Sequence, residues 1–151
     1  MTTATISMND TVYDVIDICR DGEQGFAAAA DTIVSDALKR ELLTYSRERA
    51  DFADALSDAL EELGYAPRAR DSAPGPIHCE WIDQLEKIGN NNEHTVLVAC
   101  ERGEDAAMEA YAEAMGAPIS GRLAELISDQ YQVVAATHGR IRELRDTAEY
   151  Y

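Results

Sequence analysis

The stretch LKRELLTYSRERADFADALSDALEELG, residues 38–64, decides the fold class. Its inward-facing residues return at alternating steps of four and three, which is the repeat of one face of an α-helix. This stripe reads Leu38, Leu42, Tyr45, Arg49, Phe52, Leu56, Ala59 and Leu63. The break at Val34-Ser35-Asp36 supplies a capping signal before it, and Gly64 is a typical residue just past a helix end. The pattern predicts one long amphipathic helix between these two boundaries.

Three other segments carry a stripe of the same period, and no segment shows the alternation typical of a strand. The first is capped at Asn9 or Asp10 and comprises Val12, Ile16, Cys19, Glu23, Phe26, Ala30 and Ile33. The second is capped at Asn91 or Asn92, ends at Gly116-Ala117-Pro118, and comprises Leu97, Cys100, Glu104, Ala107, Tyr111 and Ala114. The third comprises Leu123, Ile127, Tyr131, Val134, His138, Ile141 and Arg145. These four helices predict an all-α fold.

The connections between the helices differ in length. Residues 64–76 contain three of the four prolines and cannot continue a helix. A short extra helix is expected over residues 77–88, followed by a turn at residues 89–92. Since the other two connections are short, the chain is expected to form two helical hairpins joined by a long crossover, as in crossover four-helix bundles. A length of 151 residues fits a single domain, with a core over about residues 9–146 and a frayed polar tail at 147–151.

Composition narrows the function classes. Thirteen basic residues against 29 acidic ones give a net charge of −16, so the surface repels nucleic acid and anionic membranes. The sequence shows no signal-peptide pattern and no apolar run long enough to span a membrane, so the expected location is the cytoplasm. The three cysteines lack a metal-ligand spacing, which favours buried reduced thiols over the alternative of a Cys19–Cys100 disulfide.

The two halves of the chain resemble each other. Aligning ICRDGEQGF from Ile18 with ACERGEDAA from Ala99 pairs two cysteines, two glycines and two glutamates. These pairs are Cys19 with Cys100, Gly22 with Gly103, and Glu23 with Glu104. The match predicts that each half is one copy of a duplicated helical hairpin.

Each stripe also holds one polar residue at an inward position: Glu23, Arg49, Glu104 and His138. All four are predicted to meet in one buried layer. A buried carboxylate without partners is strongly disfavoured, so this layer must satisfy its own charges. Either Arg49 and His138 pair with the two glutamates in a hydrogen-bonded network, or the glutamates and the histidine coordinate a divalent metal.

Longer stretches carry a family resemblance. The runs DICRDGEQGF at residues 17–26, HCEW at 78–81 and CERGEDAAMEAY at 100–111 resemble a bacterial family of ferritin-like bundles catalogued as a domain of unknown function. The likeness extends from Thr11 to Arg145. It implies a ferritin-like crossover bundle, in which di-iron members take one glutamate from each of two helices and a Glu-x-x-His pair from each of the others.

The di-iron pattern that this resemblance implies is present only in part. Glu23 and Glu104 match the two single glutamates, and His138 matches one histidine. The remaining positions hold Ala135, Arg49 and Phe52, which supply no carboxylate or imidazole. A standard di-iron centre is therefore not expected.

These features favour a non-enzymatic structural, storage-associated or stress-related binding protein with a degenerate metal site and no cofactor. The alternative is a metal-binding oxidoreductase or iron-handling protein that uses Glu23, Glu104 and His138. Glu101, one turn before Glu104, is a further candidate ligand for a single iron, manganese or zinc ion. Self-association into a homodimer or larger assembly is also expected, from the habit of the superfamily and from apolar residues outside the main stripes. These residues are Val15, Ile18, Val96 and Val98.

Overall fold

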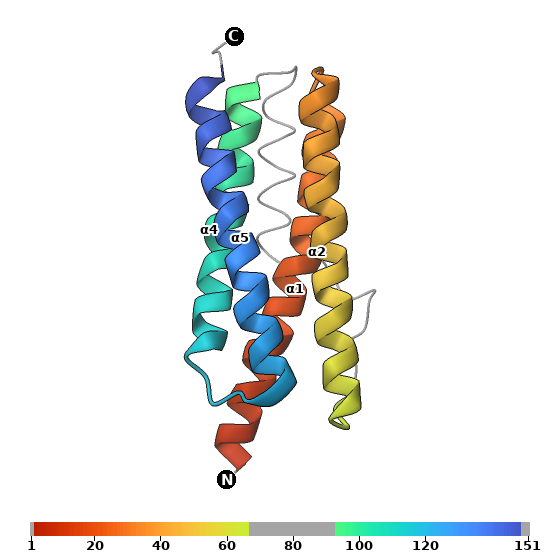
Figure 1. Cartoon of the computed structure of the whole chain (residues 1–151), viewed down its shortest axis with the longest axis vertical. Helices are drawn as coiled ribbons and strands as arrows, with labels where there is room; N and C mark the ends of the chain where they lie inside the picture. Colours follow the sequence, from red (N-terminus) through yellow and green to blue (C-terminus); the bar gives the residue numbers. More distant parts are fainter. Residues whose placement is uncertain (1, 67–92, 149–151) are drawn as a thin grey trace.

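The computed structural model describes residues 2–66 and 93–148, with side chains from Asp10 onward. These residues form four helices: α1 (Thr2–Thr32), α2 (Asp36–Glu62), α4 (Glu93–Met115) and α5 (Gly121–Thr147) (Figure 1). The all-α four-helix bundle expected from the stripes is confirmed. The short helix predicted over residues 77–88, the caps at Asn91 or Asn92 and the residues after 148 lie outside the described part of the chain.

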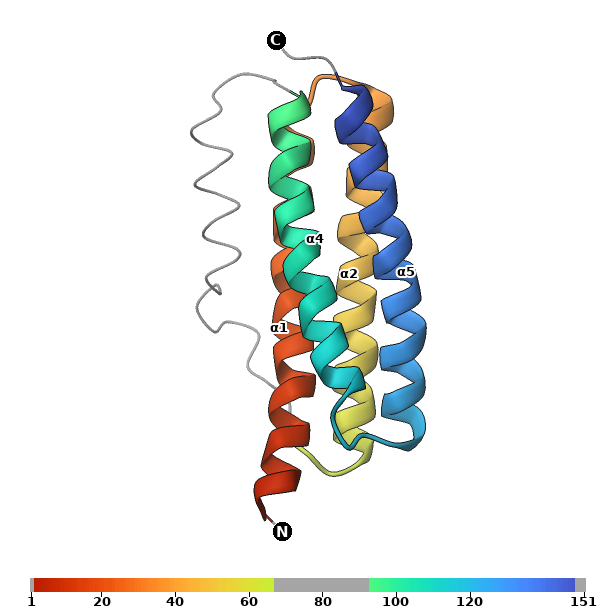
Figure 2. The same cartoon turned by 90° about the vertical axis from the view of Figure 1, so that its left-hand side faces the viewer.

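The four helices stand in a ring, in the order α1, α2, α5, α4. Each helix contacts its two neighbours in that ring, and α2 and α5 contact each other least. The direction of the chain is clear in Figures 1 and 2: α2 ends at one end of the bundle, and α4 begins at the other. The end of α2 and the start of α4 thus lie at opposite ends of the bundle, which is the placement of helix ends found in crossover bundles.

The helix ends follow local sequence signals in most places. The Ser35 side chain accepts a hydrogen bond from the Leu38 amide at 3.3 Å, which caps α2 as predicted. Gly64 has a φ of 91°, a conformation that favours glycine, directly after the end of α2. The prediction that the first helix starts near Asn9 or Asp10 is wrong, because α1 already begins at Thr2. Residues 2–9 hold no proline or glycine, and asparagine or aspartate inside a helix costs only about 0.7 kcal/mol.

The interior consists of two apolar clusters, one toward each end of the bundle. The first holds Val12, Val15, Ile16, Cys19, Ala53, Leu56, Ala59, Leu60, Ala107, Tyr111, Ala114, Leu123, Ile127 and Val134. The second holds Phe26, Ala29, Ala30, Ile33, Leu38, Leu42, Val96, Leu97, Cys100 and Ile141. On α2 and α4 the clusters leave a gap, and the buried residues in that gap include Arg49 and Glu104. No helix within residues 2–66 and 93–148 has the length and hydropathy needed to cross a membrane.

Candidate functional site: a buried ion pair at the centre of the bundle

Arg49 and Glu104 form an ion pair between the two apolar clusters. Both side chains are only 1 % exposed. Two guanidinium nitrogens of Arg49 donate to the two carboxylate oxygens of Glu104, each at 2.5 Å. This two-pronged geometry is the strongest form of a charge-assisted hydrogen bond between side chains. Since α2 and α4 are opposite members of the ring, the pair spans the interior and joins the two hairpins.

Helix α1 shapes the space that Arg49 occupies. A Cβ atom at Gly22 would lie 3.4 Å from Cγ and 3.5 Å from Nη1 of Arg49, so this glycine lets the arginine lie close against the α1 backbone. One turn further on, the guanidinium carbon lies 5.4 Å from the centre of the Phe26 ring, within the range of a cation–π contact. Phe26 in turn packs against Tyr45 of α2, with the rings tilted by 57°. The arginine is thus enclosed by α1 and held by α4.

The ion pair keeps Arg49 charged. Burial by itself lowers the pKa of Arg49, but the charge and hydrogen bonds of Glu104 outweigh burial and leave this pKa raised. The remaining guanidinium nitrogen, Nε, is buried and has no partner among the described residues. Burying two charges carries a large desolvation penalty, which the pair offsets only through its short, well-aligned hydrogen bonds. Removing only one partner would therefore strongly destabilise the fold, because the other charge would stay buried without a counter-charge.

Glu48 adds a second carboxylate near this pair. Its Oε1 atom is buried and has no hydrogen-bond partner in the described part of the chain. Burial raises the pKa of Glu48, the charge of Arg49 opposes that rise, and the charges of Glu104 and Asp51 add to it. The charged form of Glu48 is consequently disfavoured in the folded protein.

A second polar network links all four helices. Tyr111 of α4 donates its hydroxyl to Oε1 of Gln130 on α5 at 2.6 Å, and its oxygen lies 3.1 Å from the thiol of Cys19 on α1. The Gln130 amide nitrogen donates to the carbonyl of Phe52 on α2 at 3.3 Å. Because the tyrosine hydroxyl is already a donor to Gln130, the Cys19 thiol is the donor in the remaining contact. Buried hydroxyl and amide groups satisfied in this way fix the position of each helix.

The two described cysteines are free and buried. Burial raises the pKa of the Cys19 thiol to about 11, although Arg49 and the hydrogen bond with Tyr111 act against the rise. Burial also raises the pKa of Cys100. Both thiols are therefore protonated near neutral pH, the state in which cysteine is least reactive. Cys79 lies outside the described residues.

The structure places Glu23 and His138 away from the ion pair. The Glu23 side chain is 38 % exposed and faces Arg20 of its own helix at 3.8 Å. His138 is 15 % exposed, and its Nε2 lies 2.6 Å from Asp105. The prediction that both residues join one buried layer with Arg49 and Glu104 is therefore wrong. Arg49 already balances the charge of Glu104 through both carboxylate oxygens, and Glu23 instead lies near Arg20 on its own helix.

The candidate ligand Glu101 is also engaged elsewhere. Its carboxylate pairs with Arg145 of α5 and lies 3.6 Å from Arg142. No three histidine, cysteine, aspartate or glutamate side chains within residues 10–66 and 93–148 are grouped so that they could hold a metal ion. The carboxylate of Glu104, the buried member of the predicted ligand set, has both oxygens bound by Arg49. The residues that face the centre of the bundle do not fit a metal centre.

Sequence reasoning missed two buried polar residues of α5 by one position. On α5 the buried polar residues are Gln130 and Thr137, whereas Tyr131 and His138 are only partly buried. A spacing of seven is met equally by two adjacent stripes, so it does not decide which of two neighbours faces inward. A stripe that starts at Ile127 and continues in steps of three, four and three residues passes through Gln130, Val134 and Thr137. This stripe would have identified both buried polar residues. That signal was present, but a buried glutamine and threonine are less expected than a tyrosine.

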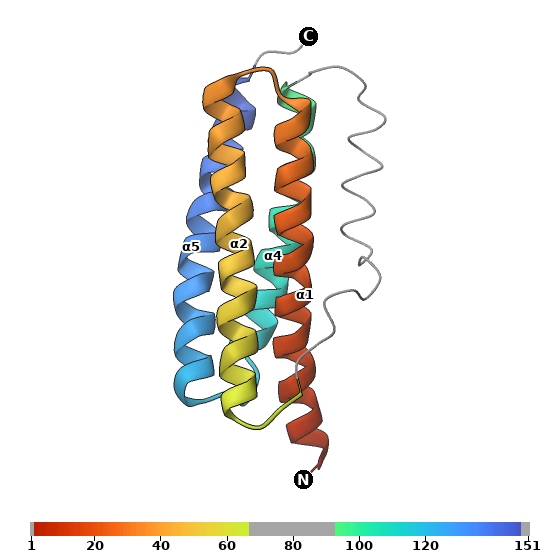
Figure 3. The ribbon, with the colours of Figure 1, turned by 90° about the vertical axis from the view of Figure 1, so that its right-hand side faces the viewer.

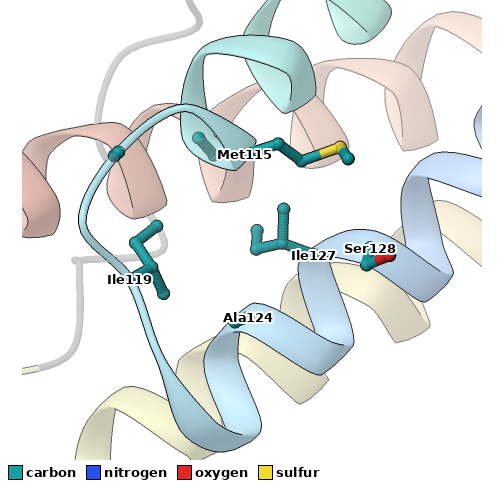
Figure 4. Close-up of a pocket in the computed structure, with 7 residues that line it drawn as sticks. Met115, Ile119, Ala124, Ile127 and Ser128 are labelled. Carbon is teal, nitrogen blue, oxygen red and sulfur yellow. The ribbon is translucent and has the colours of Figure 1, made fainter.

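A small hollow lies apart from this site, where α4 turns into α5 (Figure 4). It has a volume of about 130 Å³ and is lined by Ala114, Met115, Ala117, Ile119, Ala124, Ile127 and Ser128. Its only polar side chain is the hydroxyl of Ser128. Ligand pockets usually measure about 300–1,000 Å³ and hold several converging polar groups. This hollow is too small and too apolar to represent a typical substrate site.

Fold and site together define an all-α crossover bundle with an ion pair at its centre. The chain belongs to the family described as Domain of unknown function (DUF2383), whose pattern matches residues 8–117. The matched residues include α1 from Met8 onward, α2 and α4, and so both Arg49 and Glu104, but end before α5. No curated protein matches the chain.

Proposed function

We propose that this protein is a non-enzymatic, ferritin-like bundle in which an internal ion pair replaces a metal centre. Its role is structural, storage-associated or stress-related binding in the cytoplasm. The observation that carries this proposal is the two-pronged contact between Arg49 and Glu104, which places a permanent positive charge at the middle of the bundle.

The layout of the helices supports the ferritin-like assignment. Two antiparallel hairpins joined by a crossover, with one central glutamate on α4, match the arrangement in which such bundles build sites from facing helices. Around Glu104 the other helices present Gly22 and Arg49 in place of ligating side chains. A guanidinium cannot ligate a metal and is not deprotonated in proteins, so Arg49 neutralises the glutamate that a cation would otherwise neutralise.

Metal analysis separates this proposal from a metal-dependent function. Protein purified without chelator and then desalted is expected to hold well under one equivalent of iron, manganese or zinc. Two equivalents of iron with an oxo-bridge absorption band would overturn the proposal. One equivalent that disappears in Glu104→Ala, but remains in the control Glu109→Ala on the exposed side of α4, would instead favour a mononuclear metal protein.

A further inference from the structure

One end of the bundle combines the apolar hollow between α4 and α5 with a high density of negative charge. Helices α2 and α4 end there, and α5 begins there (Figures 1 and 3). We call residues 58–63 and 109–129 the acidic end. They hold seven carboxylates, all exposed, and one basic residue, Arg122. The carboxylates are Asp58, Glu61, Glu62, Glu109, Glu113, Glu125 and Asp129.

The other end of the bundle carries nearly balanced charges. Residues 31–41, 93–102 and 139–148, which lie there, hold six basic and seven acidic residues. Some of these charges are already paired, as Arg140 is with Glu41. By contrast, the ion pairs within the described part of the chain include none of the seven carboxylates of the acidic end. The two ends therefore differ strongly in the charge that they present to a partner.

The positions of these carboxylates destabilise the helices that carry them. Six form like-charged pairs four residues apart, and such pairs repel each other on a helix surface. The pairs are Asp58 with Glu62, Glu109 with Glu113, and Glu125 with Asp129. The carboxylates in the last turns of α2 and α4 also meet the negative end of the helix dipole, and neither turn holds a basic residue. A positively charged partner would remove both penalties.

The hollow lies directly beside one of these pairs. Two residues, Ala124 and Ser128, line both the hollow and a shallow depression on the surface of α5. The other two residues that line the depression are Glu125 and Asp129. An apolar slot and two exposed carboxylates therefore lie side by side on α5.

The hollow has the size of a single apolar side chain. Its volume of about 130 Å³ is close to that of an apolar cavity of about 150 Å³, which holds one benzene molecule. Met115, which lines the hollow in Figure 4, is 48 % exposed. Methionine is flexible and adapts its shape to the group that it contacts. A leucine, isoleucine or methionine side chain of a partner would therefore fit here.

We propose that the acidic end binds a basic segment of a partner protein. One aliphatic side chain of the segment enters the hollow, and arginine or lysine residues one helical turn away contact Glu125 and Asp129. This surface lies apart from the central ion pair, so the proposal does not depend on whether that pair replaces a metal centre.

Charge complementarity selects this partner over other occupants. Nucleic acid and anionic lipid have the wrong charge, and a small polyamine supplies no apolar side chain for the hollow. A second copy of this chain would bring its own carboxylates to the hollow, and salt must screen this repulsion before copies associate through this end. A basic segment instead gains from the same field, which also speeds its association.

A synthetic peptide tests the proposal. The probe is a fluorescently labelled peptide of about 14 residues, with a central leucine and with lysines and arginines one helical turn on either side. Fluorescence anisotropy at about 0.15 M salt is expected to show saturable binding. Replacing the leucine of the peptide by serine is expected to weaken binding roughly tenfold, because the apolar contact is lost. Glu125→Gln/Asp129→Asn is expected to weaken it roughly three- to tenfold and to reduce its dependence on salt.

Two further variants separate the charge from the hollow. Asp58→Asn/Glu62→Gln removes the same charge at the same spacing on α2, away from the residues that line the hollow, and is expected to change affinity less than about twofold. Ala124→Leu fills the hollow without changing any charge and is expected to bind the leucine and serine peptides equally. Ala117→Leu, which fills the same hollow, gives this comparison if Ala124→Leu does not fold.

Three results would overturn the proposal. The first is the absence of saturable binding to the parent protein. The second is equal binding of the leucine and serine peptides by the parent protein, which would show that only charge attracts the peptide. The third is an equal loss of affinity in the two charge variants, which would show that the peptide binds without a preference for the hollow.

Discussion

At the scale of single residues, the central ion pair is held by geometry more than by its charges alone. Arg49 is placed by Gly22 below it, by the Phe26 ring beside it and by both oxygens of Glu104. Each of these contacts uses the flat, forked shape of a guanidinium, which lysine lacks. The pair therefore acts as a specific fit between helices, a role in which buried charges can set helix register.

Removing one partner tests this role. Arg49→Leu leaves the Glu104 carboxylate buried without a cation, so the free energy of unfolding is expected to fall by about 3–5 kcal/mol. Arg49→Leu/Glu104→Leu replaces both charges by apolar groups and is expected to recover most of that loss. Urea denaturation of the two variants measures both effects. A single variant as stable as the parent protein would show that the pair is not buried in solution.

Glu48 gives a prediction with a defined pH dependence. Since its pKa is raised above the ordinary glutamate value of 4.5, the folded protein binds this proton more tightly than the unfolded chain. The charged carboxylate therefore destabilises the fold at pH 7, and the penalty is lost as the pH falls through the raised pKa toward 4.5. Glu48→Gln is expected to stabilise the protein at pH 7 by less than about 1 kcal/mol and to have little effect near pH 4. Denaturation at several pH values, with the exposed Asp58→Asn on the same helix as control, checks the sign.

At the scale of whole helices, the small residue at position 22 sets how closely α1 and α2 approach. Gly22→Ala places a methyl group at ordinary contact distance from Arg49, so the gain in helix propensity is expected to raise stability by about 0.5–1 kcal/mol. Gly22→Leu is expected to displace the arginine and lower stability by about 1–3 kcal/mol. Gly139 on α5 has nothing within 4 Å of its added Cβ and is the control, where alanine is expected to stabilise by a similar amount. A destabilised Gly22→Ala variant would mean that Arg49 lies even closer to α1.

At the scale of the whole molecule, the exposed apolar side chains are not the ones that the sequence predicted for self-association. Val15 and Val96 are fully buried within this chain, so the prediction that they form part of a self-association surface is wrong. The large apolar side chains exposed in the described residues are Val34, Leu63, Met115 and Val133. Leu63 directly follows α2, and Met115 is the last residue of α4. These two helices end at the same end of the bundle (Figure 1). These two side chains are the pair that the self-association test below removes.

Self-association remains a prediction, and light scattering tests it. A dimer or larger species is expected at micromolar concentration, with the average mass rising with salt because the net charge of −16 opposes contact between copies. Leu63→Glu/Met115→Glu is expected to lower the mass, whereas Lys39→Glu, at a partly buried site near the other end of α2, is not. A monomer at every salt concentration would contradict an assembly role.

The sequence by itself determined the four helices, because a stripe of period 3.6 and the signals at Ser35 and Gly64 are local properties of the chain. It also identified Arg49 and Glu104 as polar residues within buried stripes. Only the tertiary structure decided which neighbour faces inward, as at Gly22 against Glu23. Rotation of a helix about its axis is set by how side chains from different helices fill the shared interior and balance each other's charge. One buried arginine balances one buried glutamate, which is why Glu104 lies inside and Glu23, its counterpart in the repeat, lies toward the surface.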